Sequence, residues 1–254
     1  MEDKIYSEYC AILAEELQPA MGCTEPIAVA YCAALARKTL GCLPEDVQVY
    51  ASANIIKNVK SVVVPNTGGQ RGLTAAAAAG IVAGDADAQL QVLAGITPEQ
   101  VEEIAAYEKR GIVHVHPSDK DFIFDIQVRV SGGGHTAFAE IAGFHTNVIR
   151  LKQDGAVLLD RPYTEEGPKH ATDRSLLTVE RIVEFADAVQ IEDVQPVLQR
   201  QIDCNTAIAK EGLRGQWGAN IGRILLESYG DSTHNRAKAW AAAGSDARMN
   251  GCEL

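Results

Sequence analysis

The stretch FIFDIQVRVSGGGHTAFAEIAG, residues 122–143, decides the fold of this chain. The runs 122–130 and 136–143 are rich in apolar residues, and apolar and polar residues alternate from Asp125 to Val130, which is typical of strands. The glycines at 132–134 join the two runs and open no helix, so they do not form a phosphate-binding loop. The stretch therefore predicts neighbouring strands of an antiparallel sheet.

Further elements surround this pair of strands. Apolar runs and alternation predict four more strands, at 47–52, 112–116, 148–152 and 157–159, with Gln153-Asp154-Gly155 as a hairpin turn between the last two. Helical spacing of apolar residues predicts helices at 3–17, from about residue 24 to Gly41, at 71–83 and at 97–109. Because antiparallel sheets commonly pack one face on helices, these elements predict an α+β fold.

A polar connector between Asp160 and Leu176 marks a change of domain. We expect residues 1–160 to form an α+β domain with N-terminal helices and the antiparallel sheet. Residues 161–254 are expected to form an all-helical domain that is incomplete at its C-terminus. Its predicted helices lie at 178–189, 191–210, 217–229 and 232–243.

Composition excludes several classes of partner. The 254 residues are 46% hydrophobic and carry a formal net charge of -11, and no basic run interrupts them. Nucleic acid and anionic lipid need concentrated Lys and Arg, so neither is expected as a partner. The N-terminus does not have the pattern of a secretory signal, and no apolar stretch is long enough to span a bilayer. We expect a cytoplasmic protein whose six cysteines, at positions 10, 23, 32, 42, 204 and 252, are reduced.

The pentapeptide Gly22-Cys23-Thr24-Glu25-Pro26 is the best clue to function. Thr24 is a natural N-cap and Pro26 suits a helix start, which places a thiol and a carboxylate at the first turn. The positive end of the helix dipole would lower the pKa of Cys23 and make it a better base, nucleophile or metal ligand. A buried structural cysteine before a capped helix is about as probable from one sequence.

Three other segments carry polar groups suited to ligand binding. Asn54 and Lys57 flank a short predicted strand before the turn Pro65–Gly69, where they could hold a substrate carboxylate. His145 and Asn147 lie at a strand end, where a histidine can bind a carboxylate or move a proton. Cys252 follows Asn-Gly in a turn near the end of the chain. The alternatives are a solvated edge strand, a surface histidine and a frayed terminus.

In their order, these segments resemble the L-cysteine desulfidase family, which is related to the α chain of iron–sulfur L-serine dehydratases. The resemblance rests on Gly22–Pro26, Asn54–Asn58 with Pro65–Gly69, His145–Asn147, Lys210–Leu213 and Gly244–Leu254. It implies an oxygen-sensitive 4Fe-4S cluster that binds an amino acid and acts as a Lewis acid. It also implies β-elimination of L-cysteine or L-serine to pyruvate and ammonia, with release of sulfide or water.

The resemblance also implies roles for individual residues. Cys23 looks like the base that takes the substrate's α-proton, with Glu25 as the second catalytic candidate, and Cys252 looks like a cluster ligand. The candidates for orienting the substrate are Thr24, Asn54, Lys57, His145 and Asn147. In the family, the other cluster cysteines lie beyond the Gly-Cys-Glu-Leu tetrapeptide with which this chain stops. We therefore expect this chain to lack the complete cluster and to be inactive by itself.

A second hypothesis is an amino-acid-binding or sensory module that works without a cluster. Strands with exposed loops, here the loop of His145 and Asn147, can bind a small molecule without catalysis. Both hypotheses have a small amino acid as the ligand. An incompletely covered helical domain would also expose an apolar patch, which a second copy of the chain could cover in a homodimer.

Overall fold

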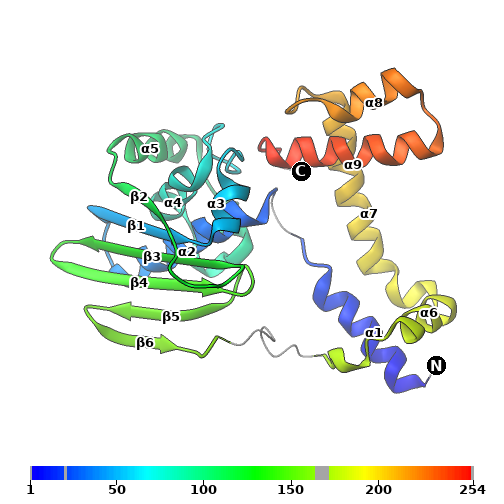
Figure 1. The fold of residues 1–254 in the computed structure, drawn as a ribbon, viewed down its shortest axis with the longest axis horizontal. Helices are drawn as coiled ribbons and strands as arrows, with labels where there is room; N and C mark the ends of the chain where they lie inside the picture. Colours follow the sequence, from blue (N-terminus) through cyan, green and yellow to red (C-terminus); the bar gives the residue numbers. More distant parts are fainter. Residues whose placement is uncertain (1, 20–21, 164–171, 253–254) are drawn as a thin grey trace.

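The computed structural model describes residues 2–19, 22–163 and 172–252 and confirms the α+β class. Figure 1 shows two lobes side by side. The α+β lobe contains a six-stranded sheet and the helices α2 to α5, and the helical lobe contains α1 and α6 to α9. Within the described ranges, no helix is long and apolar enough to cross a membrane.

The sheet has the strand order β2-β1-β3-β4-β5-β6. Its strands are β1 (Asp46–Ala51), β2 (Val113–Pro117), β3 (Asp125–Gly132), β4 (His135–Ala142), β5 (Val148–Gln153) and β6 (Ala156–Asp160). All neighbours pair antiparallel except β1 and β2, which run parallel. The predicted hairpin turn is confirmed: Asp154 and Gly155 have φ values of 49° and 82°, as two-residue hairpin loops require.

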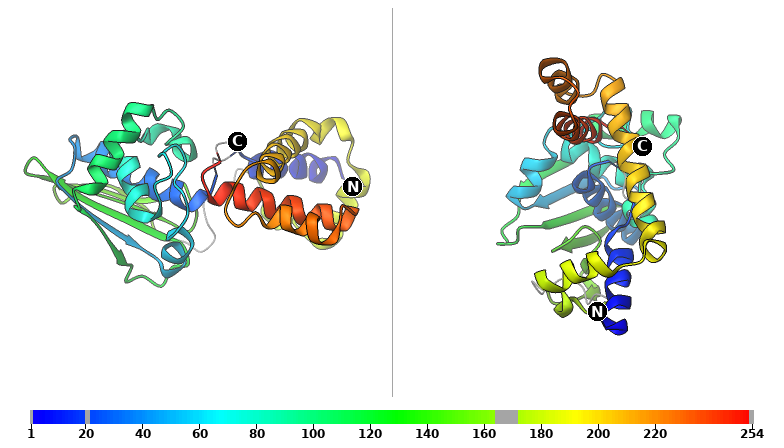
Figure 2. Two further views of the ribbon diagram at one scale, coloured as in Figure 1. Left: turned by 90° about the horizontal axis from the view of Figure 1, so that it is seen from above. Right: turned by 90° about the vertical axis from the view of Figure 1, so that its right-hand side faces the viewer.

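Helices cover only one face of the sheet (Figure 2). These are α2 (Thr24–Leu40), α4 (Gly72–Ala83) and α5 (Pro98–Lys109), with the short turn η1 (Ala86–Gln91) beside them. The alternate strand residues that face the helices are buried and apolar, for example Val49, Val128 and Ala139. Helices α2 and α4 pack so closely that a Cβ on Gly80 would lie 2.0 Å from the carbonyl oxygen of Ala30. Small side chains on both helices therefore set their separation.

The helical lobe is built on the long helix α7 (Ile191–Arg214). Its other helices are α1 (Asp3–Glu16), α6 (Val179–Ala188), α8 (Ile221–Tyr229) and α9 (Thr233–Met249), with the turn η2 (Arg174–Leu176) before α6. The aromatic rings of Tyr9 in α1 and Phe185 in α6 lie 5.1 Å apart. Tyr6 donates a hydrogen bond of 2.6 Å to Asp193 at the start of α7. Helix α1 thus packs with the C-terminal helices, although the sequence assigned it to residues 1–160; the boundary near residue 160 stays a prediction.

Several predicted elements differ from the structure. The polar segment 52–58 was predicted to flank a short strand, but most of it lies in the helix α3 (Ala53–Val59), which buries Ile55 and Val59 one turn apart. The last helix was predicted to end at 243, but α9 continues to Met249 through Gly244. Helix α9 packs against α7 at Gly244: a Cβ there would lie 3.8–4.0 Å from Ile208 and Ala209 of α7.

Candidate functional site

The pentapeptide lies at the N-terminus of α2, on the side of the α+β lobe that faces the helical lobe (Figure 1). Thr24 was predicted as the N-cap, and this prediction is wrong: Thr24 is the first helical residue, and Cys23 holds the cap position. The Cys23 side chain makes no capping hydrogen bond. Gly22 has a φ of 52°, and a Cβ there would come within 3.1 Å of Pro65. The tight entry into the helix therefore shifts its start and leaves the Cys23 side chain free for another partner.

That partner is Glu25. The Cys23 Sγ–H donates to Oε2 of Glu25 at 3.1 Å, and the Thr24 hydroxyl lies 3.5 Å from the same oxygen. The side-chain amide of Asn58, in α3, donates to Oε1 at 3.4 Å. Glu25 is thus the acceptor around which the thiol, the hydroxyl and the amide gather. Cys23, Thr24 and Glu25, all predicted as site residues, are brought together here.

The protonation of Cys23 is opposite to the sequence expectation. Burial, followed by the hydrogen bond to Glu25 and its negative charge, raises the pKa of the thiol to about 12. The helix N-terminus was expected to lower this pKa, but the thiol does not cap the helix and sits beside a carboxylate instead. At neutral pH, Cys23 is therefore a thiol that donates a hydrogen bond.

Glu25 remains ionised. Burial disfavours its charge, but the hydrogen bonds from Cys23, from its own backbone N–H and from Asn58, together with the nearby imidazole of His145, outweigh burial and lower its pKa. An ionised, half-buried carboxylate at this place is a binding point for a ligand cation such as an ammonium group. Asn58 was not among the predicted site residues, although it ends the polar segment that the sequence singled out.

His145 is the only other predicted site residue with a connection to Glu25 among the described residues. Its ring packs edge-on against Phe124, with 4.8 Å between the ring centroids. Its Nε2 is buried and has no hydrogen-bond partner within the described ranges. Burial lowers the pKa of His145, and the charge of Glu25 opposes that shift only in part. A neutral imidazole with a free ring nitrogen therefore lies near the carboxylate.

The remaining predicted binding residues lie apart from this group. Asn54 and Lys57 are exposed on α3, and neither side chain makes a hydrogen bond or ion pair within the described part of the chain. Because residues 53–59 are a helix and not a strand, Asn58 faces Glu25 while its neighbours turn outward. Asn147 donates 2.8 Å to the carbonyl oxygen of Ala142 and so stabilises its own loop.

The segment after α9 reaches back to the α+β lobe. The backbone N–H of Val63 donates to the carbonyl oxygen of Met249 at 3.0 Å, and Arg71 donates to Asn250 at 3.3 Å. Cys252 is buried in a small cluster with Ile208 and Ala247, and Trp217 packs against it. The described end of the chain is thus docked and not frayed, and its contacts hold the two lobes together.

A cavity of about 620 Å³ lies where the two lobes meet. One wall is formed by Gly22 to Glu25 and the end of α1; the other is formed by α7 and α9. The polar residues of the second wall are Arg200, Gln201, Cys204, Asn205, Ser245 and Arg248. Arg248 donates 2.5 Å to Asn205, and Arg200 donates 2.9 Å to the carbonyl oxygen of Leu17. One wall of the cavity therefore carries a neutral thiol and an ionised carboxylate, and the other carries two guanidinium groups.

The described residues do not fit a 4Fe-4S cluster. They contain no group of three or more His, Cys, Asp or Glu side chains that could hold a metal ion. Cys252, predicted as a ligand, is buried among Ile208, Ala247 and Trp217, and Cys23 is bonded to Glu25. All six cysteines are free thiols. We therefore derive no chemical step through a cluster from these residues.

Sequence comparison finds relatives over nearly the whole chain. These relatives are UPF0597 proteins. The chain is 48% identical over 253 residues to one of Desulfitobacterium hafniense, covering 100% of this chain and 59% of the relative. It is 45% identical over 250 residues to one of Lachnoclostridium phytofermentans, covering 98% of this chain and 60% of the relative. It is 41% identical over 260 residues to one of Fusobacterium nucleatum, covering 100% of this chain and 61% of the relative.

The chain thus spans about three-fifths of the length of these UPF0597 proteins. No protein-family model matches it, and no solved structure matches it significantly. The names of the relatives state neither a reaction nor a ligand, so function has to be argued from the site.

Proposed function

We propose that this protein handles a proton at the α-carbon of a small amino acid, in a β-elimination of L-cysteine or L-serine that yields pyruvate and ammonia. The observation that carries this proposal is the Cys23–Glu25 pair, with a 3.1 Å hydrogen bond, on the wall of a cavity whose other wall carries two guanidinium groups. An α-amino acid has an ammonium group and a carboxylate on one carbon. The two walls supply a partner for each.

In this proposal, the substrate ammonium binds the ionised carboxylate of Glu25, and the substrate carboxylate is held by Arg248 or Arg200 across the cavity. The ammonium takes over the acceptor that Cys23 uses in the free protein. Its positive charge also offsets the charge of Glu25, which is one of the causes of the high pKa of the thiol. Substrate binding therefore favours the thiolate of Cys23, which releases its proton to water.

The thiolate then takes the α-proton at Sγ. The electron pair of the broken C–H bond forms the Cα–Cβ double bond, and the bond from Cβ to sulfur or oxygen breaks. Cys23 returns the proton to the departing sulfide or hydroxide, which restores the thiolate. The remaining aminoacrylate takes a proton from water at Cβ, becomes the imine, and is hydrolysed to pyruvate and ammonia. We place this reaction in the cytoplasm, where six free thiols persist.

The second candidate function, an amino-acid-binding module, is favoured by the raised pKa of Cys23. A thiol with a pKa of about 12 is a hydrogen-bond donor and not a base unless binding changes its surroundings. In this alternative, Cys23, Glu25 and the arginines bind the amino acid, and the reaction does not follow.

The deciding experiment separates binding from proton transfer. L-Cysteine, L-serine and L-alanine are added to the protein in D₂O, binding is measured by calorimetry, and loss of the α-proton signal is followed by NMR. We expect binding with exchange at the α-carbon, and loss of exchange with retained binding in Cys23→Ser. Cys42→Ser, a half-buried thiol away from the cavity, is the control. Binding without exchange would favour the module, and absence of both would overturn the proposal.

Pyruvate formation is tested separately, on this chain and on the longer Desulfitobacterium hafniense relative under anaerobic conditions with iron and sulfide. Pyruvate from the relative but not from this chain would mean that elimination needs residues outside the shared region. Exchange at the α-carbon would still report what the residues of this chain contribute.

A further inference from the structure

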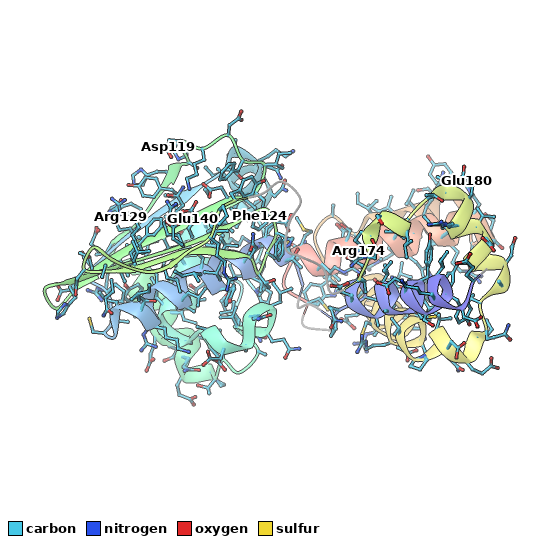
Figure 3. The ribbon with its side chains drawn as sticks, turned by 90° about the horizontal axis from the view of Figure 1, so that it is seen from below. Asp119, Phe124, Arg129, Glu140, Arg174 and Glu180 are labelled. Atoms are coloured by element: carbon cyan, nitrogen blue, oxygen red, sulfur yellow. The ribbon has the colours of Figure 1, made fainter. Side chains whose placement is uncertain are left out.

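The face of the sheet that no helix covers carries a second set of charged residues. Strand residues on this face lie in rows across the sheet, because paired residues of neighbouring strands point to the same side. One row runs Tyr50, Gln127, Glu140, Arg150, and the next runs Gln48, Arg129, Phe138, Lys152. Figure 3 shows Arg129 and Glu140 on the side of the strands away from the helices, with Asp119 above them.

The rows surround a hollow of about 400 Å³. Four cationic side chains line it, namely Lys120, Arg129, Arg150 and Lys152. The whole chain has 23 Lys and Arg against 34 Asp and Glu, so four cations around one hollow are a local concentration against the overall charge. Because the hollow is far from the pentapeptide and shares no lining residue with the cavity between the lobes, it is a separate place on the molecule.

A buried carboxylate fixes two of these cations. The Glu140 side chain is fully buried, and Lys120 forms an ion pair with one of its oxygens. A guanidinium nitrogen of Arg150 lies 3.8 Å from the other oxygen, while its Nε donates to Asp160 at 3.0 Å. Glu140 thus contacts two cations and holds both at the floor of the hollow. Together with Asp160 it balances their charge, so the net positive charge of the hollow comes from the other two cations.

The other two cations have no anionic partner among the residues that the structure describes. Arg129 and Lys152 each lie 6.0 Å from the ring centroid of Phe138, on the strands to either side of it, and neither makes an ion pair within the described residues. Their charged groups are therefore no more than twice that distance apart, above one aromatic ring. An anion with a single charged group can reach one of them well; two linked anionic groups can reach both.

Two carboxylates lie at the rim of the hollow, but neither pairs with Arg129 or Lys152 among the described residues. Asp154 accepts hydrogen bonds of 2.8 Å from His135 and from the backbone N–H of Thr136, so it is engaged at the hairpin. Asp119 is exposed at the edge of the hollow and makes no ion pair among the described residues. The centre of the hollow, over Phe138, keeps its positive charge.

We propose that this hollow binds a small polyanion with two or more phosphate or carboxylate groups. Arg129 and Lys152 contact one anionic group each across Phe138, and Lys120 and Arg150, positioned by Glu140, face the same ligand from the next row. Charge-assisted hydrogen bonds to phosphate or carboxylate are the interaction that these side chains make best. This site is independent of the amino-acid cavity and of the function proposed for it.

The test is calorimetric titration of the whole protein with pyrophosphate, citrate and inorganic phosphate. We expect pyrophosphate or citrate to bind at least about tenfold more tightly than inorganic phosphate, because two anionic groups engage two cations. The preferred one of the two identifies the phosphate or the carboxylate source. Arg129→Gln and Lys152→Gln, both changes at side chains that hold no other residue, should each weaken the binding at least about tenfold.

The matched control is Arg110→Gln, since Arg110 also lies over an aromatic ring, 5.1 Å from the centroid of Tyr107, but away from the hollow. It should bind like the unchanged protein, and so should Cys23→Ser. Equal weakening in Arg110→Gln, unchanged binding in Arg129→Gln, or no binding of any of the three anions would overturn the proposal. Tighter, strongly salt-dependent binding of a single-stranded oligonucleotide through Arg129 would overturn the small-ligand assignment in favour of nucleic acid.

Discussion

The protonation of Cys23 gives a quantitative prediction for its reactivity. With a pKa of about 12 in place of 9.0, the thiolate fraction near neutral pH falls about 1000-fold, since each pKa unit is tenfold. A more basic thiolate is also a better nucleophile. With a Brønsted slope near 0.45, a rise of three pKa units makes the thiolate about 20-fold more reactive and so offsets part of this loss. Cys23 should therefore react with an aromatic disulfide on the order of 50-fold more slowly than an ordinary thiol.

Glu25→Gln should accelerate this reaction. A thiolate and a carboxylate 3.1 Å apart repel by about 1.3 kcal/mol if water fully screens them, which is about one pKa unit and a lower bound for a half-buried pair. Lowering the thiol pKa by one unit raises the thiolate fraction about tenfold but makes the thiolate about threefold less nucleophilic, so the reaction should become about threefold faster. The control is Glu16→Gln, because Glu16 also lines the cavity and has no hydrogen bond to Cys23.

The assay follows modification of each cysteine by mass spectrometry between about pH 7 and pH 10. The rate at Cys23 should rise about tenfold per pH unit through the whole range, which limited access to a thiolate would not produce. Exposed Cys204, on the opposite wall of the cavity, reports that the reagent reaches this place. A rate at Cys23 that is flat above pH 8, or equal rates in Glu25→Gln and Glu16→Gln, would refute the role of Glu25.

Three further predictions concern stability. Gly80→Ala should lower the free energy of unfolding by about 2–4 kcal/mol, because its Cβ would lie 2.0 Å from the Ala30 oxygen. The control, Gly95→Ala, has open space around the new Cβ and should leave this free energy unchanged. Chemical denaturation measures both. Phe185→Ala should cost about 3 kcal/mol and expose the contact between α1 and α6 to proteolysis; unchanged protease resistance would contradict it. Burial lowers the pKa of His145 below 6.5 in the folded state. As the pH falls through about 6.5, this histidine therefore takes up a proton in the unfolded state before it does so in the folded state, and stability is lost. His145→Gln should therefore lose less Tm than the unchanged protein between about pH 7.5 and pH 5.5, and an equal loss would count against this assignment.

Elements with a clear local period could be predicted from the sequence. In β3, from Asp125 to Val130, polar and apolar residues alternate because one face packs on the helices and the other carries the polar side chains. The helix predicted at 97–109 is α5, and it begins with a capping box in which Thr97 and Gln100 each bond the other's backbone. The parallel pairing of β1 and β2 could not be predicted, because nothing in a strand's own sequence says which strand lies beside it.

Glycines misled the prediction of the last helices. The helices predicted at 191–210 and 232–243 stop short of Gly212 and Gly244, but both glycines lie inside helices. A Cβ on Gly212 would lie 2.1 Å from the carbonyl oxygen of Ala243, so α7 and α9 can approach this closely only because position 212 has no side chain. A Cβ on Gly244 would make ordinary contacts at 3.8–4.0 Å. A glycine that ends a helix and a glycine that lets two helices touch look the same in one sequence.

The candidate site was predicted in part for the same reason. Cys23, Thr24 and Glu25 are adjacent in the chain, and their contacts are local. Asn58 reaches Glu25 only because residues 53–59 are helical, which an Ile-Ile pair between polar residues did not indicate. Arg200 and Arg248 are separated from the pentapeptide by more than 170 residues. Arg248 lies in the segment Gly244–Leu254 that the sequence singled out, but only the packing of the lobes shows that both arginines line the cavity.

The two walls of the cavity link binding to the contact between the lobes. Glu25 and Cys23 belong to the α+β lobe, whereas both guanidinium groups come from α7 and α9 of the helical lobe. An amino acid that uses both walls therefore pulls the lobes together, and separating them removes the partner of its carboxylate. The described contacts that hold them are few: the hydrogen bonds of Met249 with Val63 and of Asn250 with Arg71, and the packing of Gly251 against Val63. In the proposed function, the ammonium group that binds Glu25 would also offset one of the causes of the high thiol pKa, while burial of Cys23 remains. Closer contact between the lobes and a larger thiolate fraction would then both follow from one binding event.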